Sequence, residues 1–265
     1  MNWGLIALIS GAVIYGLASK SRAISGFDSP LYGVSGELVS IIVPTLQEEE
    51  YLPNLLTSIY NQTYKNIEVI ISDSSSPESK ERTQQVIDEW KYYLNVKMVN
   101  SPKLNVSQGR NIGAQHALGS MLCFLDADCI MESGYIEKLV TDIQNGALLA
   151  HGMDCTYDND IRNALTSLWL IFKPNNYTTG RGILIRTDIF NAIGGYDINL
   201  DPSSARVRED LDLGRRVEQA YGSGSVFLDT EAFSAESSRR PLLQGLSNPN
   251  AIWGHRGYRK NVVID

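Results

Sequence analysis

The chain has 265 residues, 43% hydrophobic and 20% charged, which is typical of a folded globular protein with a substantial core. Its formal net charge of −7 argues against a nucleic-acid-binding protein, because such proteins normally have a basic balance. The three cysteines, Cys123, Cys129 and Cys155, lack metal-ligand spacing, and their odd number suits a reducing compartment.

The N-terminal residues differ in composition from the rest of the chain. No charge occurs from Trp3 to Ala18, and Lys20 and Arg22 follow. This run is slightly shorter than the roughly 17–25 residues of a membrane-spanning helix, and it lacks the positive n-region of a signal peptide. We expect residues 1–22 to be a membrane anchor with the remainder cytoplasmic, because positive charges favour the cytoplasmic side. A buried core helix is the alternative.

Residues 23–36 are rich in serine and glycine and are predicted to be a linker. Beyond them, short apolar runs alternate with segments of helical spacing. Predicted strands cover 39–43, 67–71, 96–99 and 121–125, and predicted helices cover 52–59, 77–90 and 107–118. This alternation predicts right-handed βαβ units and an α/β fold with a parallel sheet.

The second half of the chain alternates less regularly. Predicted helices cover 135–143, 161–172, 187–193 and 209–221, and predicted strands cover 147–153, 182–186 and 225–228. Residues 236–265 contain several arginines and form a locally basic tail. Such a tail can meet anionic lipid or a phosphorylated substrate near a membrane, and a solvated surface tail is the alternative.

The apolar run from Met121 to Leu125 leads directly into Asp126 and Asp128. Such a run suits a strand buried on both faces, and open α/β sheets bind ligands at the carboxyl ends of these strands. Two carboxylates there suit Mg²⁺ or Mn²⁺, whose coordination is completed by a substrate's phosphates. The alternative is that this sequence merely ends a strand and caps the next helix.

Polar residues also follow the other predicted parallel strands. Pro44, Thr45 and Glu48 follow the first strand, and Asp73 follows the second. Parallel strands direct their carboxyl ends to one edge, so we expect these residues to share a crevice with the aspartates above. Taken singly, Asp73 is typical of an Asx turn, and Glu48 and Glu49 are typical of a helix's first turn.

Several short motifs occur in a fixed order along the chain. They are Val39-Ser-Ile-Ile-Val-Pro-Thr-Leu-Gln-Glu-Glu-Glu-Tyr-Leu-Pro53, Ile71-Ser-Asp-Ser-Ser-Ser76, Ser107-Gln-Gly-Arg-Asn-Ile-Gly113, Phe124-Leu-Asp-Ala-Asp128, Gly194-Gly-Tyr-Asp197 and Arg208-Glu-Asp-Leu-Asp-Leu-Gly-Arg215. Over roughly residues 39–228 the chain resembles family 2 glycosyltransferases of the GT-A fold. The resemblance implies a Rossmann-like, mixed, mostly parallel sheet flanked by helices. Within a domain spanning 37–265, it makes 37–129 the nucleotide-binding half and 130–235 the acceptor-binding half.

The resemblance also implies roles for individual residues. The positions that would bind the nucleotide or nucleotide-sugar are Pro44, Thr45, Glu48, Asp73, Arg110 and Asp126. Asp128 would ligate Mn²⁺ or Mg²⁺, which would neutralise the charge that the leaving nucleoside diphosphate gains. A surface ion pair is the alternative for Arg110.

Asp210 matches the family position of the base that takes the acceptor's proton in an inverting transfer. By the same resemblance, Glu209, Tyr196 and Asp197 would lie on the acceptor side. A carboxylate that meets the helix dipole is the alternative for Asp210, and plain packing is the alternative for Tyr196.

The sequence departs from the family's pattern in places. Gln47 stands where asparagine is usual, and Ser72 stands where an acidic residue often precedes Asp73. The histidine that often completes the metal shell is not evident, and Glu236 occurs in that region. No Gln-x-x-Arg-Trp sequence occurs, which argues against a processive cellulose- or chitin-type synthase.

The sequence therefore predicts an inverting, metal-dependent glycosyltransferase of the hexosyltransferase type. Its predicted partners are a nucleotide-diphospho-sugar donor, a glycan or lipid-linked acceptor and a membrane, with no nucleic acid. A polyprenyl-phosphate sugar synthase is the nearest variant. A nucleotidyltransferase on the same sheet edge would not need the base Asp210. A non-catalytic carbohydrate-binding or partner-binding module is the third alternative.

Overall fold

The computed structural model describes residues 33–102, 105–156, 178, 181–200 and 208–237, together with 11, 14, 17, 18 and 20–22. The strands are β1 (Val39–Thr45), β2 (Ile67–Asp73), β3 (Asn95–Asn100), β4 (Met121–Phe124), β5 (Cys129–Met131), β6 (Leu149–Thr156), β7 (Ile183–Arg186) and β8 (Val226–Glu236). The helices are α2 (Leu52–Tyr60), α3 (Pro77–Trp90), α4 (Val106–Gln115), α5 (Tyr135–Gln144), α7 (Thr187–Ala192) and α8 (Glu209–Tyr221).

The eight strands form one mixed sheet in the order β3-β2-β1-β4-β7-β6-β8-β5. Strands β1 to β4 run parallel to one another, as the βαβ alternation predicts. Strand β7 is antiparallel to both β4 and β6, whereas β8 is parallel to β6 and antiparallel to β5. The change of direction at β7 marks the border between the two halves of the chain.

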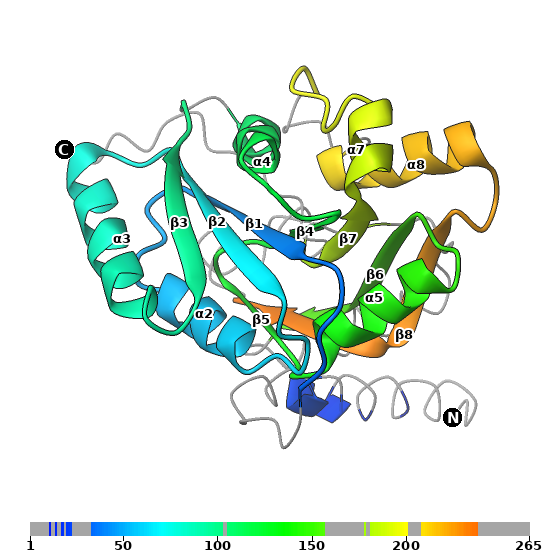
Figure 1. Cartoon of the computed structure of the whole chain (residues 1–265), viewed down its shortest axis with the longest axis horizontal. Helices are drawn as coiled ribbons and strands as arrows, with labels where there is room; N and C mark the ends of the chain where they lie inside the picture. The colour runs from blue at the N-terminus through cyan, green and yellow to red at the C-terminus, as the bar shows by residue number, and fades with distance from the viewer. Residues whose placement is uncertain are drawn as a thin grey trace, which may run out of the picture.

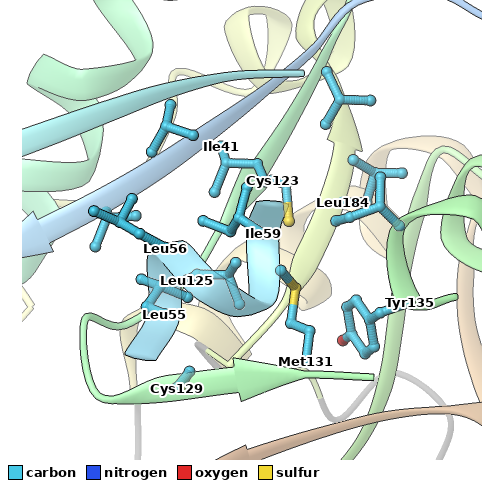
Figure 2. Close-up of a cluster of buried hydrophobic side chains, with 14 of the residues drawn as sticks. Ile41, Leu55, Leu56, Ile59, Cys123, Leu125, Cys129, Met131, Tyr135 and Leu184 are labelled. Atoms are coloured by element: carbon cyan, nitrogen blue, oxygen red, sulfur yellow. The ribbon is translucent and has the colours of Figure 1, made fainter. Parts of the chain in front are cut away.

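Helices cover both faces of this sheet (Figure 1). On one face, α2, α3 and α5 enclose the larger hydrophobic core, and on the other face α4, α7 and α8 enclose a second core. In the larger core, Leu55, Leu56 and Ile59 of α2 pack toward Ile41 and Cys123 of the sheet (Figure 2). Successive β1 residues point to opposite cores, as the unbroken apolar run predicts for a doubly covered strand.

Local sequence signals fix several element boundaries. Helix α3 begins where the Ser76 hydroxyl accepts the N–H of Ser79, with Pro77 in the first turn. The predicted first strand ends at residue 43, but β1 continues through Pro44 to Thr45. Proline is tolerated there because the pairing of β1 with β4 has already ended at Ile42.

Two strands differ from the sequence prediction. The short strand β5 was not predicted, and β8 extends well beyond the predicted range of 225–228. Both depend on pairing between distant segments, because β8 joins β5 to β6 across the sheet. Their residues alternate too weakly in polarity for a local pattern to reveal them.

Some predicted segments lie outside the described residues, namely the helix at 161–172, the tail beyond residue 237 and most of residues 1–32. Within the described part of the chain, no helix has the length and apolar character needed to cross a membrane. The membrane anchor predicted at residues 1–22 stays a prediction, because most of that segment lies outside the described residues. The three cysteines are buried free thiols, and burial raises the pKa of Cys155 to about 12.

Candidate active site

The ends of β1 and β2 are joined through a buried carboxylate. Asp73 Oδ2 accepts a hydrogen bond from Thr45 Oγ1 at 2.9 Å, and Asp73 Oδ1 accepts one from the Ser75 N–H at 2.7 Å. The second bond forms an Asx turn, as the alternative for Asp73 predicted. The same contacts hold the carboxylate at the carboxyl edge of the sheet.

The loop after β1 has an unusual backbone conformation. Gln47 has a φ of 57°, a left-handed value that asparagine adopts more readily than glutamine. Its N–H donates to Ser75 Oγ at 2.8 Å, which ties the loop to the end of β2. This left-handed conformation explains why asparagine is usual at this position. Gln47 adopts it here although glutamine prefers it less than asparagine does.

The two glutamates after β1 do not lie in a first helical turn, because α2 begins only at Leu52. That alternative is wrong. Glu48 is buried, and its carbonyl accepts the N–H groups of Tyr51 and Leu52. Glu49 accepts from Ser79 and Arg82 of α3. Burial opposes ionisation of Glu49, but these bonds leave the pKa of its carboxyl below its ordinary value.

Asp126 and Asp128 lie in the loop that follows β4, and both are buried. Within the described residues, they form with Cys129 the one group of three potential metal ligands, with ligand atoms within 4.8 Å of one another. Carboxylate oxygens suit Mg²⁺ and Mn²⁺, whereas a thiol suits softer metals. The donor set therefore fits a hard divalent cation held by the two aspartates.

The helix-capping alternative for this loop is wrong. The chain continues from Asp128 into β5, and the next helix, α5, has Gly134 at its N-cap. The loop is instead held by the residue that follows β8, the strand paired with β5, because the Ser237 N–H donates to the Asp128 carbonyl at 3.2 Å.

Arg110 of α4 joins this loop to the start of α8. Its Nη2 donates to Asp126 Oδ1 at 3.0 Å, and its Nη1 donates to Glu209 Oε1 at 3.0 Å. The guanidinium carbon lies 5.1 Å from the ring centre of Tyr196. The side chain is only 1% exposed, so the surface ion-pair alternative is wrong.

The surroundings of Arg110 keep it charged. Burial lowers the pKa of a guanidinium, but Tyr196, Asp126, Glu209 and Asp210 together raise the pKa of Arg110 above its ordinary value. A permanently charged group thus lies between the two carboxylates that contact it.

Glycines in α4 bring Arg110 to this place. A Cβ at Gly113 would lie 2.4 Å from Ile42 Cγ2, and a Cβ at Gly109 would lie 3.2 Å from Pro44 Cβ. Only glycine at position 113 allows the helix to lie so close to β1. Arg110, between these two glycines, consequently reaches the edge of the sheet.

The Gly195-Tyr196 loop is fastened to the same helix. Asn111 Nδ2 donates to the Tyr196 carbonyl at 2.8 Å, and Asn111 Oδ1 accepts the Tyr196 N–H at 2.9 Å. The Tyr196 ring packs against Phe124 and Phe190, so the packing alternative applies to the ring. Asp197 is exposed and accepts the Asn199 N–H at 2.8 Å.

The Tyr196 hydroxyl is buried and has no hydrogen-bond partner among the described residues. Burial raises the pKa of this hydroxyl, Arg110 lowers it, and Asp210, Glu209 and Asp126 raise it further, so that the net shift is upward. The group therefore stays protonated and can donate a hydrogen bond to a ligand oxygen.

Asp210 lies in the first turn of α8 and is fully buried. Its Oδ2 accepts from Arg208 Nη2 at 2.5 Å, and its Oδ1 accepts the Leu211 N–H at 2.8 Å. The position is compatible with both sequence readings, because a carboxylate in a first turn meets the positive end of the helix dipole. Asp210 directly follows Glu209. Arg110 therefore connects the start of α8, which contains Asp210, to the loop of Asp126 and Asp128.

Three buried charged residues, Asp154, Arg181 and Glu236, lie near the loop of Asp126 and Asp128, which we call the metal-ligand loop. Arg181 forms ion pairs with Asp154 and Glu236, and Glu236 lies opposite Cys129 in the pairing of β8 with β5. The motif order drew attention to Glu236 but not to its partners Arg181 and Asp154. The sequence signal that could have indicated the two partners is a charged residue at the end of a predicted apolar strand, as at Arg181 and Asp154.

The profile described as Glycosyl transferase family 2 matches residues 40–200 of this chain, more than half of its length. An uncharacterized glycosyltransferase of Haemophilus influenzae is 30% identical over 191 residues, 66% of this chain and 60% of the relative. The GalNAc(5)-diNAcBac-PP-undecaprenol beta-1,3-glucosyltransferase of Campylobacter jejuni is 32% identical over 112 residues, 41% of this chain and 35% of that protein. The matches thus span about a third to three fifths of these relatives.

Among solved structures, a mannosyltransferase from Pyrobaculum calidifontis in complex with GDP-Man and Mn²⁺ matches with a TM-score of 0.53. It is 17% identical, and the match covers 85% of this chain and 67% of that one. At this identity the likeness shows the fold, which agrees with the predicted GT-A type. With the family profile matched over more than half of its length, the chain belongs to glycosyl transferase family 2.

Proposed function

We propose that the protein is an inverting, divalent-metal-dependent glycosyltransferase that moves a hexosyl group from a nucleotide-diphosphate donor to an acceptor. The observation that supports this most strongly is the buried connection Asp126–Arg110–Glu209. It joins the loop suited to a hard cation to the helix whose second residue is the candidate base, Asp210. The proposal includes a domain spanning 37–265, with its donor half at 37–129 and its acceptor half at 130–235.

On the donor side, the nucleoside would lie against the ends of β1 and β2. The residues proposed to line it are Pro44, Thr45, Glu48 and Asp73. Asp126 and Asp128 would hold Mn²⁺ or Mg²⁺, in line with their oxygen donors and with the Mn²⁺ named for the mannosyltransferase. The cation would supply neutralisation of the charge on the leaving diphosphate.

On the acceptor side, Asp210 would accept the proton of the acceptor hydroxyl while that oxygen attacks the anomeric carbon. The bond between the anomeric carbon and the diphosphate oxygen breaks, and the nucleoside diphosphate leaves with the electron pair. Attack opposite the leaving group inverts the anomeric configuration. The protonated Tyr196 hydroxyl, Glu209 and Asp197 would orient the acceptor or the sugar.

A lipid-linked acceptor is part of the proposal, since the relative from Campylobacter jejuni is named for a PP-undecaprenol substrate. Membrane association through residues 1–22 is proposed with it. Ile14 is 68% exposed and Leu17 is 46% exposed, and both precede the basic Lys20 and Arg22. Arg22 also forms an ion pair with Glu231 at 3.2 Å, which would hold the segment to the domain.

The test uses the full chain and a panel of UDP- and GDP-sugars. Nucleotide release in the presence of Mn²⁺ is measured, and the binding of UDP and GDP with Mn²⁺ is measured by calorimetry. We expect metal-dependent hydrolysis of one donor class, and a loss of about 100-fold or more in Asp128→Asn. Asp88→Asn is the matched control, since the exposed Asp88 contacts Lys91 and Gln84 on the surface, away from the proposed site.

Three outcomes would contradict the proposal. The absence of micromolar nucleotide binding would favour a non-catalytic carbohydrate-binding or partner-binding module. Pyrophosphate release with nucleotidyl transfer would favour a nucleotidyltransferase. Full activity of Asp128→Ala would remove the metal assignment.

A further inference from the structure

The guanidinium of Arg110 is enclosed on both edges and on one face. One arm donates to Asp126 and the other donates to Glu209, both at 3.0 Å, and the face lies over Tyr196. We propose that Arg110 is a positioning residue that sets the distance between the donor side and the acceptor side of the site. This inference rests on the proposed function and assigns Arg110 a role other than direct contact with the nucleotide.

Freeing the Arg110 side chain from its two carboxylate partners would be energetically costly. Arg110 is 1% exposed, and Asp126 and Glu209 are 7% and 19% exposed, so the two bonds are charge-assisted and shielded from water. Turning the guanidinium toward a nucleotide would leave at least one buried carboxylate without this partner, and breaking a buried pair is strongly unfavourable. The present contacts are therefore the stable arrangement.

The contacts of Arg110 join segments that are far apart in the sequence. Asp126 is 16 residues away from Arg110 in sequence and belongs to the loop after β4, whereas Glu209 is 99 residues away and begins α8. Asp210 follows Glu209 directly. Arg110 thus contacts both the loop of Asp126 and Asp128 and the residue directly before the candidate base.

Helix α4, which bears Arg110, is packed tightly against the sheet. Gly113 allows α4 to lie against Ile42 of β1, and the neighbouring Asn111 fastens the Tyr196 loop through two hydrogen bonds. Two consecutive residues of one tightly packed helix therefore hold two separate segments of the acceptor half. A planar guanidinium suits this task, because it offers two donor edges in fixed directions, whereas a lysine ammonium is a point charge.

The experiment compares Arg110→Lys, Glu209→Gln and the double variant in the full chain. Donor hydrolysis gives kcat and KM, and calorimetry with UDP or GDP plus Mn²⁺ gives the nucleotide Kd. For Arg110→Lys we expect kcat to fall about 100-fold, because misplacement of catalytic groups by about 1 Å has an effect of this size. The nucleotide Kd is expected to change less than about 3-fold, because Arg110 does not touch the nucleotide.

The double variant tests the connection itself. If Arg110 acts through Glu209, the double variant is expected to be no slower than the slower single variant, since effects of residues in one network are not additive. Arg186→Lys is the matched control, because Arg186 forms an exposed ion pair with Asp188 at 2.6 Å. Its kcat is expected to match that of the unsubstituted chain.

Four results would overturn the inference. A weaker nucleotide Kd with unchanged kcat would make Arg110 a direct nucleotide ligand. Additive losses in the double variant would show no coupling to Glu209. A loss of kcat in proportion to the unfolded fraction, measured by thermal unfolding, would make the contact purely structural. If Arg110→Lys does not fold, an unchanged kcat in Glu209→Gln would overturn it.

Failure of the proposed function gives a different result, because the unsubstituted chain would then bind neither UDP nor GDP with Mn²⁺. In that case the variants have no donor hydrolysis to compare. A chain that binds nucleotide with Mn²⁺, and whose variants fail the tests above, contradicts only the role of Arg110.

Discussion

The two halves of the molecule hold their site residues in different ways. In residues 37–129, the proposed donor half, Asp73 is held by Ser75, two residues away, and by Thr45 on the adjacent parallel strand. In the acceptor half, Glu209 is held by a residue 99 positions away, and the Tyr196 loop is held by one 85 positions away. The donor edge thus follows from strand order, whereas the acceptor side depends on contacts with α4.

Substitution of the candidate base should separate the two halves most clearly. In Asp210→Asn, we expect kcat to fall by roughly 10²–10⁴-fold, because an amide cannot accept the proton. Binding of UDP or GDP with Mn²⁺, measured by calorimetry, should change little, since the donor half is intact. Asp212→Asn, in the same helical turn and paired with Arg216, should keep kcat. Equal losses of binding and kcat would contradict the comparison.

Gly113→Ala should affect both halves, because it acts on the helix that connects them. The new Cβ would lie 2.4 Å from Ile42 Cγ2, so α4 must move away from β1. We expect a loss of about 3 kcal/mol in the free energy of unfolding, measured by urea denaturation, together with slower donor hydrolysis. Gly134→Ala is the control, since its Cβ would meet only Lys138 Cε at 3.6 Å. A stable, fully active Gly113→Ala would refute the role of α4.

Asn111→Ala should affect the acceptor half alone. It removes two hydrogen bonds to the Tyr196 backbone, which are worth about 1 kcal/mol each. We expect the free energy of unfolding to fall by about 2 kcal/mol, while the nucleotide Kd stays within about 3-fold. A nucleotide Kd that weakens as much as stability would show that the donor half also depends on this loop.

A smaller effect on stability is expected at the contact between the Asp142 and Asp229 carboxylates, which lie far apart in the sequence. Burial and the nearby Asp229 carboxylate raise the pKa of Asp142 to about 6. A raised carboxyl pKa gives a contribution to stability that is complete at low pH and is lost as the pH rises through about 6. Burial of the ionised Asp142 carboxylate and its repulsion from Asp229 therefore destabilise the fold at neutral pH.

Asp142→Asn should remove this repulsion. At pH 7.5 we expect a gain of roughly 1 kcal/mol, a modest value because solvent screens the pair, and a rise of about 2–4 °C in melting temperature. The gain should shrink as the pH is lowered toward 4. Thermal unfolding at several pH values measures it, and a gain independent of pH would contradict the assignment.

The donor half was largely predictable from local patterns. The apolar runs that became β1, β2 and β4 lead directly into Thr45, Asp73 and Asp126, and parallel strands must bring these positions to one edge. The acceptor half was less predictable. Strand β5 and most of β8 beyond residue 228 escaped detection because their pairing joins distant segments, and nothing local indicates that Arg181 pairs with Glu236.

By itself the sequence determined which residues are available and where they lie along each element. Apolar periodicity and the order of the motifs sufficed for an α/β sheet with carboxylates at strand ends. Only the tertiary structure decided that Arg110 bridges Asp126 and Glu209 within the interior. The reason is physical: a charged side chain has many partners within reach, and the packing of α4 on β1 selects among them.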